Sequence, residues 1–146
     1  MFADTLLALE RAHLARLFAW ALASMLWGSL LLAFIAVRRA ADQLPLLRHF
    51  AIQLLAWGVI NLAIALWAQR GLKLRDYAGA RSLDRILWLN LGLDVGYIGV
   101  GIAIAVAGWV LGRRLGAVGA GIGVVVQGAA LFLLDLVIVR QLLTNV

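Results

Sequence analysis

The chain has 146 residues, of which 65% are hydrophobic and 14% are charged, and its mean hydropathy is +1.01. This composition lies far outside the range of soluble globular domains and predicts an integral membrane protein with one small domain. Cysteine is absent, which excludes disulfides, iron–sulfur clusters and thiolate chemistry. The net charge is +6, but the basic residues stand at the edges of apolar runs, where they suit lipid headgroups. Nucleic-acid binding is therefore not expected.

The first sixteen residues mix apolar and charged side chains with the period of a helix. We expect a short amphipathic helix over residues 3–16 that lies at the membrane interface. Its leucines, Leu6 among them, would face lipid, and Glu10 and Arg16 would face water.

Four apolar runs can be marked out along the chain, each with the roughly 20 residues that a helix needs to cross about 30 Å of hydrocarbon. The expected fold class is all-α, an integral membrane four-helix transmembrane bundle in a single domain, residues 1–146. An even number of spans puts both termini on one side of the membrane. The runs cover residues 17–37, 50–68, 86–111 and 115–139.

Basic residues set the expected orientation of the bundle. Eight of the 13 lie on the side that holds the termini, and the other five lie on the side that holds the two hairpin turns. By the positive-inside rule, this excess favours cytoplasmic N and C termini.

The last two runs carry stripes of glycine and aspartate spaced by seven residues. Seven residues make almost two helical turns, so each stripe lies on one helix face. If the chain folds back at Arg113 and Arg114, glycine meets glycine and aspartate meets aspartate. Glycine at such a contact lets transmembrane helices approach closely, which predicts a helix-packing seam. The stripes are Asp94, Gly101 and Gly108 in the third run and Gly121, Gly128 and Asp135 in the fourth.

Polar side chains gather in one half of the expected bilayer. Asn90, Asp94 and Tyr97 have i, i+4, i+7 spacing and form one face, and Asn61 and Asp135 fall in the same half. Two aspartates that face each other in low dielectric need neutralisation, either by one shared proton or by an arginine of the rim beside the termini. The nearest such arginines in the sequence are Arg16, Arg85 and Arg140.

This polar cluster has two interpretations. It is either a structural clamp that fixes the register of the last hairpin, or a proton or cation relay centred on Asp94. A clamp should bury Asp94 in a dry hairpin, whereas a relay should leave it facing an aqueous cavity. A relay would also require the short chain to form a homo-oligomer.

Trp27 and Trp57 fall near the expected midplane, where lipid offers the indole N–H no partner. Both should therefore face protein or a bound molecule. Helix packing is the simpler interpretation, and a pocket for a flat lipophilic molecule is the alternative.

Enzymatic signatures are not found in the chain. The two histidines, His13 and His49, fall at opposite membrane faces, so together they cannot form a metal site or a bis-histidine haem site. Ser24 lacks the Gly-x-Ser-x-Gly context of a nucleophilic serine. No enzyme activity, metal or cofactor is expected.

A block within residues 80–97 resembles a signature of small four-span bacterial membrane proteins of unknown function. The matching letters are ARSLDR at 80–85 and LWLNLGLDVGY at 87–97. The resemblance implies a bacterial inner-membrane location and singles out Asn90, Asp94 and Tyr97, but it implies no activity.

The sequence thus favours a non-enzymatic membrane protein that acts through contacts with lipid, a lipophilic ligand or partner subunits. Two alternatives stay open. One is a homo-oligomeric proton- or cation-coupled transporter or channel centred on Asp94. The other is a pigment- or quinone-binding subunit of a larger membrane complex, with Trp27 and Trp57 near the bound molecule. The lipid bilayer is the expected partner in every case.

Overall fold

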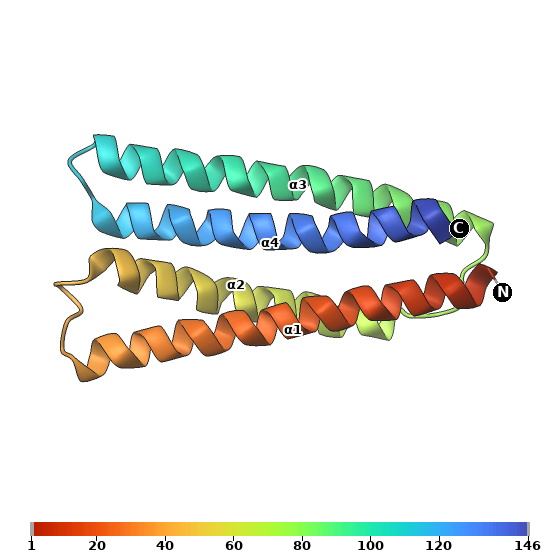
Figure 1. The fold of residues 1–146 in the computed structure, drawn as a ribbon, viewed down its shortest axis with the longest axis horizontal. Helices are drawn as coiled ribbons and strands as arrows, with labels where there is room; N and C mark the ends of the chain where they lie inside the picture. The colour runs from red at the N-terminus through yellow and green to blue at the C-terminus, as the bar shows by residue number, and fades with distance from the viewer. Residues whose placement is uncertain (1, 146) are drawn as a thin grey trace.

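The computed structural model describes residues 2–145, which form four helices and no strand (Figure 1). The helices are α1 (Phe2–Val37), α2 (Pro45–Arg70), α3 (Tyr77–Val110) and α4 (Leu115–Asn145). All four are long and apolar enough to cross a membrane. The predicted fold class, an all-α multi-pass transmembrane bundle, is confirmed.

The predicted interfacial helix over residues 3–16 is not a separate element, because these residues are the first turns of α1. Leu6, Glu10 and Leu17 are buried on one face of this continuous helix. The prediction that Leu6 faces lipid and Glu10 faces water is therefore wrong. The cause is tertiary packing. The ends of α3 and α4 extend beyond the predicted apolar runs and cover this face of α1.

Helix ends follow local chemistry. The first turn contains Arg39 at φ 49°, and α2 then begins at Pro45, whose fixed φ and missing N–H suit a first helical turn. The N-cap of α3 is Asp76, whose side chain accepts a hydrogen bond from the Gly79 N–H at 2.8 Å. The last turn reverses the chain through Gly112 at φ 97° and Arg113 at φ 52°.

The bundle consists of two hairpins, α1 with α2 and α3 with α4 (Figure 1). Helix α4 packs against all three other helices and is the most buried of the four. Both termini lie at one end of the bundle, beside the loop between α2 and α3, and the two short turns lie at the other end (Figure 1).

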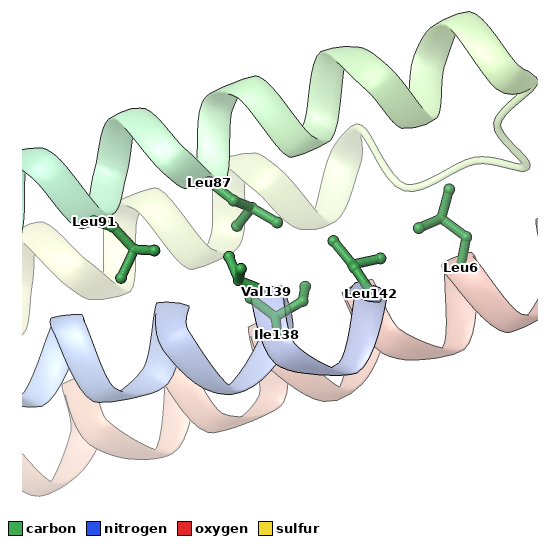
Figure 2. Packing of buried hydrophobic residues seen from close by; sticks show 6 residues of the cluster. All are labelled: Leu6, Leu87, Leu91, Ile138, Val139 and Leu142. Carbon is green, nitrogen blue, oxygen red and sulfur yellow. The ribbon is translucent and has the colours of Figure 1, made fainter. Parts of the chain in front are cut away.

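An apolar core lies at the end that holds the termini, where α1, α3 and α4 converge (Figure 2). Elsewhere the outer surface carries many exposed large apolar side chains, as expected of helices that face lipid. The core residues are Leu6, Leu87, Leu91, Ile138, Val139 and Leu142.

Candidate functional site

A buried polar cluster joins three helices next to the apolar core. The His13 Nε2 of α1 lies 3.3 Å from the Asp135 Oδ1 of α4, and the Asn90 side chain of α3 is close enough to interact with the same carboxylate. Asp94 of α3 lies close enough to Asp135 for the two carboxyl groups to interact electrostatically. The exposed fractions are only 9% for His13, 7% for Asp135 and 4% for Asp94. The arrangement ties α1, α3 and α4 through one carboxylate.

The basic partner of Asp135 is His13 rather than one of the expected arginines. Arg85 and Arg140 are exposed, so they do not neutralise the buried acids. Arg16 is half-buried and close enough to His13 for their charges to interact. Sequence reasoning placed His13 at the interface and missed this role. The sequence signal that could have indicated a buried His13 is its spacing from Glu10 and Leu17, which puts all three residues on one face of α1.

Asn61 belongs to a second polar network and not to the aspartate cluster. Its side chain donates to the Gln127 Oε1 at 3.4 Å, and the Trp20 Nε1 donates to the same oxygen at 2.9 Å. The Gln127 Nε2 in turn donates to the Ser24 Oγ at 3.1 Å. Gln127 is 0% exposed and links α1, α2 and α4. This central position of Gln127 was not predicted from the sequence.

Tyr97 and Trp57 contact each other rather than the aspartates. Their rings meet edge to face with centroids 5.0 Å apart, which links α2 to α3. Trp27 is 61% exposed, so helix packing does not account for its position, and the alternative of a pocket stays open. It lines a pocket together with Trp20, but Trp57 does not line that pocket. The two tryptophans therefore do not share this pocket.

The glycine stripes of α3 and α4 lie against each other. A Cβ placed on Gly101 would come within 2.7 Å of the Gly121 carbonyl oxygen, and one on Gly128 within 3.1 Å of the Asp94 carbonyl oxygen. A Cβ on Gly108 would meet the Ala117 Cβ at 2.8 Å. Only glycine permits this approach of the two backbones.

A second close contact, which was not predicted, joins α1 to α2. A Cβ on Gly28 would meet the Leu55 nitrogen at 2.8 Å, and one on Gly58 the Met25 nitrogen at 2.9 Å. Each hairpin is thus held by glycine contacts between its two helices.

One further ion pair closes the end of the bundle beside the termini. Arg75, in the loop between α2 and α3, donates through Nε to the carboxylate of the buried Glu10. Within residues 2–145, no group of three or more histidine, aspartate or glutamate side chains is arranged to hold a metal ion. The polar groups thus connect helices to one another.

The fold and these contacts define a multi-pass membrane protein with a four-helix bundle and a buried polar core. The chain belongs to a family of unknown function (DUF6992), whose model matches residues 16–136. The predicted membership of an uncharacterised family is confirmed. No curated protein and no solved structure is significantly similar to the chain.

Proposed function

We propose that this chain is a non-enzymatic protein of a bacterial inner membrane that acts through contacts with lipid, a lipophilic ligand or partner subunits. In this proposal Asp94 and Asp135, together with His13 and Asn90, form a structural clamp. The observation that carries it is the buried pair of His13 and Asp135, whose nitrogen and oxygen lie 3.3 Å apart and join α1 to α4. Asp94 and Asp135 line neither the pocket at Trp27 nor the pocket at Leu6 and Tyr77.

The depth of the cluster supports a clamp. Counted at about 1.5 Å per residue from the turn ends of their helices, Asp94 lies about 24 Å and Asp135 about 30 Å along the bundle. A hydrocarbon core of about 30 Å that starts at the turns would therefore end near Asp135. Polar groups at that boundary can fix the helices in register, and leaving one of them buried without its partner is costly.

A proton or cation relay centred on Asp94 is the second candidate, and one observation favours it. The Asp94 Oδ2 is buried and has no hydrogen-bond partner within the described chain. An intramembrane acid with a free oxygen is typical of ion pathways.

Proton flux and stability together separate the two candidates. The protein would be reconstituted in vesicles that contain a pH-sensitive dye, with a pH gradient imposed across the membrane. For a clamp, we expect wild type and Asp94→Asn to leak no faster than protein-free vesicles. We also expect Asp135→Ala to lower the free energy of unfolding in detergent micelles by about 3 kcal/mol, because it leaves His13 buried without its partner.

Asp42→Ala is the matched control, since Asp42 is an exposed acid in the first turn and its loss should leave stability nearly unchanged. Flux above the protein-free rate that Asp94→Asn abolishes would overturn the clamp in favour of the relay.

A further inference from the structure

A pocket of about 330 Å³ lies among α1, α2 and α4. It is located between the polar cluster and the end of the bundle that holds the two short turns. This volume is in the range of small-molecule sites. Trp27, at its wall, is largely exposed to the surroundings of the bundle, so the pocket is reached from the lipid. Its walls are Trp20, Ala23, Ser24, Trp27, Leu31, Phe50, Leu54 and Val126.

The walls offer mainly apolar surface, and the polar side-chain atoms among them belong to Trp20, Ser24 and Trp27. The Trp20 Nε1 donates to the Gln127 Oε1, and the Ser24 Oγ accepts from the Gln127 Nε2, whereas the Trp27 side chain is largely exposed. A polar ligand would have to compete with this network, whereas a hydrocarbon chain would not. The lining therefore fits an acyl chain.

One face of α1 leads from this pocket to a charged group at the turn end. Trp27, Leu31, Phe34 and Arg38 are spaced by four, three and four residues, which keeps them on one helix face. Arg38 continues the helical hydrogen bonding through its N–H to the Phe34 carbonyl at 3.1 Å. Its guanidinium carbon also lies 5.3 Å from the centroid of the Phe34 ring. The aromatic ring thus holds the arginine on the face of α1 that also carries Trp27 and Leu31.

The dimensions match one leaflet of a bilayer. Arg38 is 11 residues from Trp27, or about 16 Å along the helix. One leaflet of a hydrocarbon core of about 30 Å is about 15 Å thick. A lipid whose phosphate contacts Arg38 can therefore reach the Trp27 wall of the pocket with its acyl chain.

The positive charge at the end of the bundle that holds the two turns favours an anionic headgroup. The two turns and the first residues of α2 carry five arginines and one acid, Asp42. Basic sites between transmembrane helices bind anionic lipid headgroups. The arginines are Arg38, Arg39, Arg48, Arg113 and Arg114.

We propose that the pocket and Arg38 form a binding site for one anionic phospholipid of the bilayer. One acyl chain occupies the pocket between α1, α2 and α4, and the phosphate lies against Arg38. The site rests on the proposed function, in which the chain acts through contacts with lipid or a lipophilic ligand, and it names the class of that ligand.

Native mass spectrometry of the full chain tests the site with two lipids, phosphatidylglycerol and phosphatidylcholine of identical acyl chains, added in equal amounts. We expect wild type to retain one phosphatidylglycerol in preference to phosphatidylcholine. Arg38→Gln should weaken phosphatidylglycerol retention about fivefold, the effect of one interfacial arginine. Ala23→Phe, which fills the pocket, should abolish retention of both lipids.

Two control variants change the same types of side chain, an arginine and a tryptophan, at positions outside the proposed site. Arg48 is an exposed arginine of the same end, and Trp109 is an exposed tryptophan of α3 with Arg113 over its ring at 4.9 Å. Trp109→Ala should retain phosphatidylglycerol like wild type. Arg48→Gln removes the same charge from that end without touching the proposed phosphate position, so it should weaken retention much less than Arg38→Gln. If Ala23→Phe fails to fold, Trp27→Ala tests the same wall at an exposed position.

Equal retention of both lipids by wild type would overturn the headgroup assignment. Equal losses in Arg38→Gln and Arg48→Gln would overturn the site at Arg38, and undiminished retention in the pocket variants would overturn the acyl-chain site. None of these results bears on proton flux, so a failure here is distinguishable from a failure of the clamp.

Discussion

At the scale of single residues, the interior is organised by side chains that each serve several helices. Gln127 uses both lone pairs of its carbonyl oxygen for Trp20 and Asn61 and its amide for Ser24. No water is available in hydrocarbon to replace these partners. One amide therefore fixes the relative rotation of α1, α2 and α4.

Replacing Gln127 with leucine keeps the volume and removes the hydrogen bonds. We expect Gln127→Leu to lower the free energy of unfolding by about 2 kcal/mol, because three polar groups then lose their buried partner. Thermal unfolding in detergent micelles measures this change. The exposed Gln69 is the control, and Gln69→Leu should change stability by less than about 0.5 kcal/mol. Similar losses in both variants would contradict the central role of Gln127.

At the scale of elements, α4 packs through glycine on two faces. One face meets α3 through Gly121 and Gly128, and another meets α2 through Gly119 and Gly123. In a membrane, where apolar surface alone does not drive helices together, close packing of small residues supplies much of the attraction. This explains why α4 is the helix that contacts all the others.

The same substitution at two glycines should have opposite effects. A Cβ on Gly121 would lie 2.5 Å from the Ala105 nitrogen, so Gly121→Ala must push α3 and α4 apart. We expect it to destabilise the bundle by about 1–3 kcal/mol. A Cβ on Gly96 would meet nothing within 4 Å, so Gly96→Ala should be neutral or should stabilise α3 by up to about 1 kcal/mol. Thermal unfolding of the two variants in micelles measures the direction of each change in stability. Changes in the same direction for both variants would contradict the packing described.

At the scale of the whole molecule, the helices are longer than a hydrocarbon core is thick, and a core that starts at the turns leaves the surplus at the end with the termini. Helix α1 has 36 residues and is about 54 Å long, well beyond the roughly 30 Å of a hydrocarbon core. The surplus carries Glu10, which pairs with Arg75, and the apolar core of Figure 2. The end with the termini thus has an apolar core and an ion pair, and it is also the end with more basic residues.

Orientation can be measured directly because the chain has no cysteine. If the end with the termini is cytoplasmic, as the positive-inside rule favours, Gln43→Cys in the first turn should react with an impermeant maleimide added to intact cells. Lys73→Cys in the loop between α2 and α3 should react only after the membrane is permeabilised. Both positions are exposed in the structure. The reverse pattern would invert the assignment.

The sequence by itself determined the class of fold. Composition and four apolar runs require membrane-spanning segments, and a backbone in lipid must satisfy its hydrogen bonds within each segment, which leaves helices. The seven-residue spacing of Gly101 and Gly108, and of Gly121 and Gly128, also indicated which faces of α3 and α4 meet, because helical periodicity is a local property.

Only the tertiary structure decided which polar residues share a site. His13 reaches Asp135, and Asn61 reaches Gln127, across 122 and 66 positions of the chain, between helices that are not consecutive. Helical periodicity states the direction of a side chain relative to its own helix but not the rotation of that helix against a distant one. That rotation is set by packing of the whole bundle, which is why Trp27 came to line a pocket while Trp57 came to face Tyr97.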